Sequence, residues 1–253
     1  MSGPAPEGDG DNPAPRGGSP ESLGRGPGEA QVVVFAKEPV PGKVKTRLTP
    51  PFTPCEAAAL AAAALADTLR TVARVPAIRH VLVLDGSAGA WLPESFTVLP
   101  QRGRDLDQRL AAAFEDAHRL LPVPTVLIGM DTPQVTPGLL TTALSSLGPH
   151  DAVFGPAEDG GFWLLGLRVP DPALLLGVPM SAPTTGAAQV RRLTEAGLSV
   201  AVLPRLTDVD TAADAYAVAA LAPCSAFAAA LAGTGRFPGG PSAERMTSGP
   251  HPE

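Results

Sequence analysis

Cysteines and aromatic residues are scarce in this 253-residue chain, and positive charge is not in excess. Its two cysteines, Cys55 and Cys224, lie far apart with no Cys or His at metal-ligand spacing, which disfavours a zinc site and a disulfide framework. The formal net charge of −6 disfavours a nucleic-acid-binding protein, because such proteins usually present a basic patch to the phosphates. We therefore expect no nucleic-acid partner.

Long apolar runs are also missing. The longest, residues 57–66, is mostly alanine and falls well short of the roughly 20 apolar residues that a membrane helix needs. The N-terminus lacks a basic segment followed by an apolar one, so we expect no signal peptide. These absences predict a cytoplasmic protein without a membrane span.

Glycine and proline, by contrast, are abundant, with 27 and 30 residues, and many of them gather at the two ends. Segments of this kind cannot bury enough apolar surface to offset the entropy lost on ordering. We therefore predict disordered tails at 1–30 and 233–253. A single domain over 31–232 lies between them.

Within that domain, short β-branched runs alternate with helical periodicity. Strands are expected at 31–36, 80–85, 125–130 and 199–203, and a strand pair at 152–155 and 162–167. Helices are expected at 54–74, 106–121, 137–147 and 211–221. The alternation predicts an α/β fold whose mainly parallel sheet is covered on both faces. Ligands bind at the carboxyl ends of the strands in such sheets, so the chemistry is expected there.

A basic loop follows the first expected strand. It begins at Ala36, turns at Gly42 and carries four cations, namely Lys37, Lys43, Lys45 and Arg47. Cations and backbone N–H groups gathered in this way can bind a diphosphate. The plainer alternative is a solvated loop. The Walker A and G-x-G-x-x-G patterns are absent, which disfavours P-loop hydrolysis and dinucleotide redox chemistry.

Acidic residues follow three other expected strands. Asp131, in the sequence GMDTP, could hold a divalent cation against phosphates, although an Asp turn or helix cap is the simpler interpretation. In LTDVDTAAD, a capping box explains Asp210 or its neighbours but leaves Asp208 unexplained. A second metal carboxylate reaching back toward Asp131 is the alternative.

The third acidic group, Glu158-Asp159, precedes Gly160 and Gly161, where the backbone can approach a ligand closely. A carboxylate there could bind sugar hydroxyls or remove a proton from an acceptor hydroxyl. A solvent-facing hairpin tip is the structural alternative. Phe162, next in the chain, could stack on a sugar or a base, with core packing as the alternative.

Five motifs in order, FAKEPVPGKVKTRL, QRGRDLDQRLAAAF, GMDTP, GPAEDGGFWLLGL and DVDTAAD, resemble the DUF2064 family across about 31–222. The resemblance implies a Rossmann-like GT-A three-layer sandwich, the fold of nucleotide-diphospho-sugar transferases. It also implies that Asp131 binds Mg²⁺ or Mn²⁺ and that Arg102, in the second motif, contributes to nucleotide binding. The chain departs from the family pattern at Asp107, where Gly is usual, and near Met180-Ser181, where Trp is usual.

The leading hypothesis is a metal-dependent glycosyltransferase that uses a nucleoside diphosphate-sugar and a small-molecule acceptor. Ala36 and Gly42, with the loop cations, would bind the diphosphate. Asp131 with Asp208 or Asp210 would bind the metal, and Asp159 or Glu158 would be the base. The alternatives are a nucleotidyltransferase, since the chain also resembles guanylyltransferases distantly, and an inactive nucleotide-binding homologue. A homodimer through the Ala-rich helix is left open.

Overall fold

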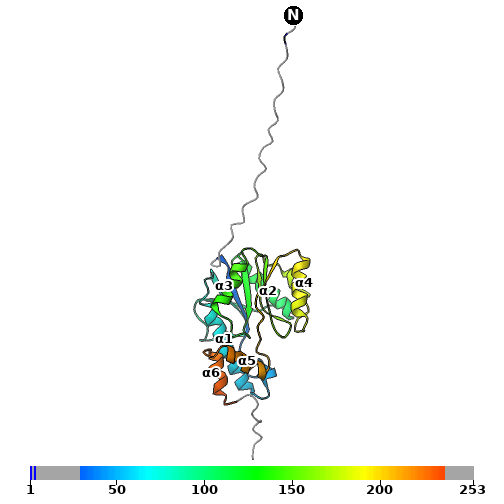
Figure 1. Cartoon of the computed structure of the whole chain (residues 1–253). Helices are drawn as coiled ribbons and strands as arrows, with labels where there is room; N and C mark the ends of the chain where they lie inside the picture. The colour runs from blue at the N-terminus through cyan, green and yellow to red at the C-terminus, as the bar shows by residue number, and fades with distance from the viewer. Residues whose placement is uncertain (2, 4–28, 237–253) are drawn as a thin grey trace, which may run out of the picture.

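The structure, a computed structural model, describes residues 1, 3 and 29–236 (Figure 1). Most of the predicted disordered tails, 1–30 and 233–253, therefore lies outside the described residues. None of the helices within 29–236 combines the length and the apolarity that a membrane span requires.

Seven strands form one sheet in the order β3-β2-β1-β4-β6-β5-β7. Their bounds are β1 Gln31–Lys37, β2 Arg79–Asp85, β3 Phe96–Pro100, β4 Thr125–Gly129, β5 Ala152–Pro156, β6 Phe162–Leu167 and β7 Val200–Val202. Every neighbouring pair is parallel except the two pairs made by β6, which runs antiparallel to β4 and β5. The predicted α/β class with a mainly parallel sheet is thus confirmed.

Helices cover both faces of this sheet because successive β1 side chains point to opposite sides. Val32 and Val34 pack in one core with α1 (Pro54–Val72) and α3 (Pro137–Ser146). Val33 packs in a second core with α2 (Leu106–Leu120) and α4 (Thr185–Glu195). Figure 1 shows these two pairs of helices on opposite sides of the strands.

A third core joins the N-terminal half of α1 to α5 (Ala212–Leu221) and α6 (Ala226–Gly233). Figure 1 shows α5 and α6 together beyond one end of the sheet. Asp67 on α1 stabilises this arrangement, because its carboxylate accepts hydrogen bonds from the N–H groups of Ala226 and Phe227 at 3.0 and 2.8 Å. Both N–H groups lie in the first turn of α6, where no carbonyl of the helix itself can accept from them.

Local sequence signals located most of the elements. The expected cap Thr53 accepts a hydrogen bond from the Glu56 N–H, and Pro54 begins α1. Thr211 caps α5 in the expected capping box with Asp214. The expected elements did not include β3, α4 or α6. Helix α2 ends one residue before Leu121, and Leu106, expected on its buried face, is exposed.

Candidate functional site

A cavity of about 670 Å³ opens at the carboxyl ends of β1 and β4. Eleven of the predicted site residues line it: Ala36, Lys37, Lys43, Lys45, Arg47, Asp131, Asp159, Gly161, Phe162, Asp208 and Asp210. The topology brings them together because β1 and β4 are parallel neighbours, with Phe35 level with Gly129. Residues that follow different strands therefore line one cavity, as predicted.

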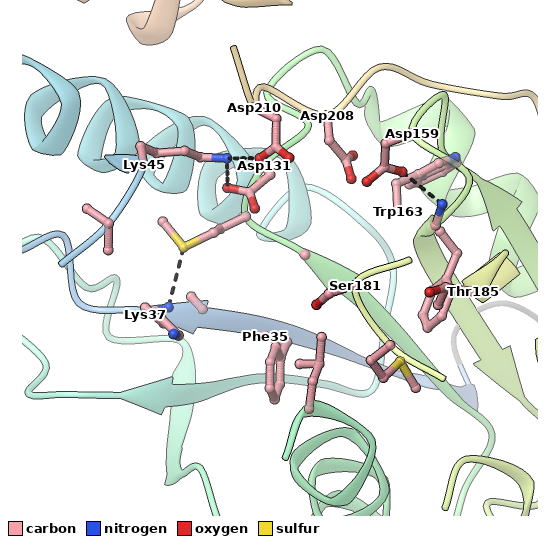
Figure 2. Close-up of a pocket in the computed structure, with 18 of the residues that line it drawn as sticks. Phe35, Lys37, Lys45, Asp131, Asp159, Trp163, Ser181, Thr185, Asp208 and Asp210 are labelled. Carbon is pink, nitrogen blue, oxygen red and sulfur yellow. Dashed lines mark hydrogen bonds and ion pairs between the residues drawn. The ribbon is translucent and has the colours of Figure 1, made fainter. Parts of the chain in front are cut away.

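Lys45 was predicted to bind a phosphate, but its ammonium is already paired with carboxylates. It has left-handed backbone geometry, with φ 48°, just before the short 3-10 helix η2 (Thr46–Leu48). Its ammonium lies 2.7 Å from Oδ1 of Asp131 and 3.7 Å from Oδ1 of Asp210, and it donates to the carbonyl of Val209. Only 9% of its side chain is exposed. Figure 2 shows this ammonium between the two carboxylates.

Val209 fixes the segment that carries Asp208 and Asp210. Its side chain is buried in the third core, and its N–H donates to the carbonyl of Asp131 at 2.9 Å. Arg47 holds Asp210 from the cavity side through a 2.8 Å ion pair. Packing of α5 and α6 therefore sets where both acidic side chains lie relative to Asp131.

Asp208 is the most perturbed acid of the site. Its Oδ1 atom is buried and has no hydrogen-bond partner within the described part of the chain. Burial, followed by the negative charges of Asp131, Asp159 and Asp210, raises the pKa of Asp208 to about 7, although Lys45 opposes the shift. The positive charge of Lys45 therefore does not offset burial and the three neighbouring acids.

Asp159 completes the cluster from the hairpin between β5 and β6. Its Oδ1 accepts a hydrogen bond from the Gly161 N–H at 2.8 Å, which orients the exposed carboxylate. Figure 2 shows the carboxylates of Asp159 and Asp208 facing the same space. Glu158 does not line the cavity, and its N–H pairs with the carbonyl of Leu206.

Gly160, which does not line the cavity either, shapes this hairpin. Its φ of +88° suits glycine, and a Cβ atom there would lie 2.0 Å from the carbonyl oxygen of Pro183. The Gly186 N–H also donates to the carbonyl of Gly160 at 2.8 Å. The hairpin is therefore held directly against the start of α4.

Lys37 and Lys43 are the cations left for an anionic ligand. Both line the cavity, and neither forms an ion pair with any residue that the structure describes. Gly42, at φ +77°, turns the loop that presents Lys43 but does not itself line the cavity. Arg102 lies outside the cavity, where Asp116 and Glu115 on α2 bind its guanidinium and raise its pKa.

Most of the apolar side of the cavity was not predicted from the sequence. Phe35, Leu106, Leu110, Leu127 and Met180 line it together with Phe162. Apolar residues in strands and helices indicate core packing, and nothing local marks those that face a cavity. The exception is Leu106, an apolar residue in the first turn of α2 that stays 37% exposed.

A metal could be held by carboxylates of this site. Between residues 29 and 236, no three His, Cys, Asp or Glu side chains already converge as a ligand set. Mg²⁺, however, is commonly bound by one or two carboxylates with substrate phosphates. The unpartnered Oδ1 of Asp208 and the surplus of negative charge around it fit a hard divalent cation, with Asp131 beside it.

Comparison with known proteins identifies the family of this chain. The family model described as "Uncharacterized protein conserved in bacteria (DUF2064)" matches residues 61–182. A crystal structure from Desulfovibrio desulfuricans G20, provisionally described as a nucleotide-diphospho-sugar transferase, is 31% identical with a TM-score of 0.76. The match covers 82% of this chain and 95% of that one. The chain belongs to the DUF2064 family.

More distant similarity shows the fold alone. A structure of CMP:2-keto-3-deoxy-manno-octonic acid synthetase with CTP is 14% identical with a TM-score of 0.50, and the match covers 77% of this chain and 98% of that one. A search of curated proteins found no match. The DUF2064 model matches neither Lys45 nor Asp208 and Asp210, so within that cluster it covers only Asp131 and Asp159.

Proposed function

We propose that this DUF2064 protein transfers a sugar from a nucleoside diphosphate-sugar to a hydroxyl group of a small-molecule acceptor, using Mg²⁺ or Mn²⁺. The GT-A sandwich implied by the resemblance is part of the same proposal. Its main support is Asp208, whose buried Oδ1 atom has no hydrogen-bond partner among the described residues and which is set among three other acids. Cations of the same cavity, Lys37 and Lys43, supply the complementary binding surface for a diphosphate.

The charge balance favours a divalent cation. Four carboxylates, those of Asp131, Asp159, Asp208 and Asp210, face only two bound cations, Lys45 and Arg47. The remaining two negative charges match one Mg²⁺ or Mn²⁺. Asp131 and Asp208 would hold it, and when bound it would neutralise charge on the departing diphosphate.

The protein side chains divide the remaining work. Lys37 and Lys43 bind the diphosphate, and Lys45 positions Asp131 and Asp210 through its ammonium. The Asp159 carboxylate takes the proton of the acceptor hydroxyl, whose oxygen then forms a bond to the anomeric carbon. The bond from that carbon to the diphosphate oxygen breaks, and the nucleoside diphosphate leaves with the electron pair.

The first test is thermal stabilisation of the purified protein by nucleoside diphosphates, diphosphate-sugars and nucleoside triphosphates, each with and without Mn²⁺. A ligand that binds only the folded state raises its stability. We expect a Mn²⁺-dependent shift with one diphosphate-sugar and its diphosphate. Stabilisation by a triphosphate alone, with pyrophosphate released when a phosphorylated acceptor is added, would instead establish nucleotidyl transfer.

A further inference from the structure

The cavity has a second, apolar end that the diphosphate chemistry does not use. Six side chains form it: Phe35, Leu106, Leu110, Leu127, Phe162 and Met180. They come from β1, α2, β4, β6 and the loop before α4. Figure 2 shows Phe35 and Ser181 on the side of the cavity away from Asp208 and Asp210.

This apolar end is more open than the core beneath it. Val33 and Val83, on the α2 side of the sheet, are almost completely buried. Phe35, Phe162 and Met180 pack on the same core but are only partly buried. Partly exposed apolar side chains that converge on a concave surface are typical of a small-molecule site.

The wall that carries Met180 is held in place at both ends. Asp107 on α2 accepts a hydrogen bond from the Gly177 N–H at 2.9 Å. Further along, the Thr185 hydroxyl accepts one from the Ala182 N–H at 3.1 Å. The segment between them, which includes Ser181 at φ +56°, is therefore fixed beside the cavity before any ligand binds.

The chemistry of this lining discriminates between ligands. Its six side chains offer no strong hydrogen-bonding group, and Ser181 supplies one hydroxyl at the edge. A nucleobase or a sugar placed there would lose hydrogen bonds to water without replacing most of them, which is costly.

From these observations we infer that the apolar end binds the hydrocarbon part of the acceptor, so that the acceptor is an aromatic or alicyclic alcohol rather than a sugar. The identification of this ligand as the acceptor rests on the proposed function. The binding preference itself does not depend on it. It therefore can be tested without a donor or a metal.

The test is calorimetric titration of the full chain with 2-naphthol, an aromatic body with one hydroxyl, and with myo-inositol as the polar comparison. We expect 2-naphthol to bind and myo-inositol not to bind. Leu106→Gln should weaken 2-naphthol binding at least tenfold, because a polar amide replaces apolar surface. Leu120→Gln is the matched control, since Leu120 lies on the same helix, is 44% exposed and does not line the cavity.

Met180→Gln provides a second variant on the opposite wall, should Leu106→Gln disturb the start of α2. Unchanged 2-naphthol binding in both variants, or no binding to the wild type, would overturn the inference. Competition by an unphosphorylated nucleoside would assign this end to the base instead. If 2-naphthol binds as expected but no diphosphate-sugar stabilises the protein, the proposed function fails and the apolar site stands.

Discussion

The ammonium of Lys45 lies 2.7 Å from Oδ1 of Asp131 and so occupies one side of the carboxylate that would bind a metal. It also lies 3.7 Å from Asp210. A fixed positive charge at this point allows acids from two distant segments to approach each other. Asp208 forms no such ion pair within the described residues, and its buried Oδ1 atom has no hydrogen-bond partner there.

Removing this charge is expected to destabilise the protein in the absence of metal. Lys45→Met keeps most of the unbranched side chain but removes the ammonium and leaves Asp131 and Asp210 to repel each other. The cost is about 1–2 kcal/mol because Asp131 is partly solvated. Urea denaturation with and without Mn²⁺ measures this loss in the free energy of unfolding. Mn²⁺ should stabilise Lys45→Met more than the wild type, and Lys43→Met, which breaks no ion pair within the described chain, should unfold like the wild type. Equal stability of both variants would contradict this role for Lys45.

Asp208 is expected to make stability depend on pH. Its pKa of about 7 in the folded state exceeds its ordinary value of 3.8, so between those values the folded protein keeps a proton that the unfolded chain has lost. The contribution of Asp208 to the free energy of unfolding should therefore fall as pH rises from 4 to 7. Asp208→Asn should remove this pH-dependent loss of stability. Above pH 7 its free energy of unfolding should exceed that of the wild type by at most about 4 kcal/mol.

The measurement is urea denaturation of both proteins between pH 4 and 8, without divalent metal. The difference between the two free energies of unfolding isolates Asp208 from the other titrating groups. Parallel pH curves for the two proteins would show that this carboxylate titrates normally.

The site acids should separate binding from chemistry. Asp131→Asn is expected to lose the Mn²⁺-dependent thermal shift with the donor, because it removes a charged oxygen ligand. Asp159→Asn should keep that shift but lose turnover by at least 100-fold, since it removes the proposed base. Glu195→Gln, an exposed change on α4, is the control for both. A fully active Asp159→Asn would require another base.

Gly160→Ala should damage the fold more than Gly42→Ala. Both glycines have positive φ, at +88° and +77°, but a Cβ at Gly160 would meet the Pro183 carbonyl at 2.0 Å whereas one at Gly42 meets nothing within 4 Å. We expect about 1 kcal/mol of backbone strain at Gly42 and roughly 2–3 kcal/mol at Gly160. Thermal denaturation compares the two, and equal losses would mean that the 183–186 segment moves aside.

The sequence was informative wherever a local signal sufficed. The cap at Thr53, the capping box at Thr211 and the alternation of strands with helices led to the sheet and to the strand ends where the cavity lies. The edge strand β3 was missed because only one end of it is well buried and it ends in proline. Helix α4 begins without a side-chain cap, so its start carries no such signal.

Eleven residues that line the cavity could be named from sequence, but not the way they pair. Lys45 and Asp131 are far apart in the chain, and only the folded backbone brings the ammonium to the carboxylate rather than to a ligand. The same holds for Arg102, whose carboxylate partners lie on α2. The apolar end was not foreseen, because its residues are indistinguishable from core residues until the packing is known.

The order of the chain also bears on how the protein is made. All seven strands precede Asp208, since β7 ends at Val202. During synthesis the sheet can form its hydrogen bonds while Asp131 still lies apart from the two later acids. The repulsion within the cluster is then met only when α5 and α6 dock, and burial of Phe227 and Leu231 against α1 supplies favourable energy at that same step.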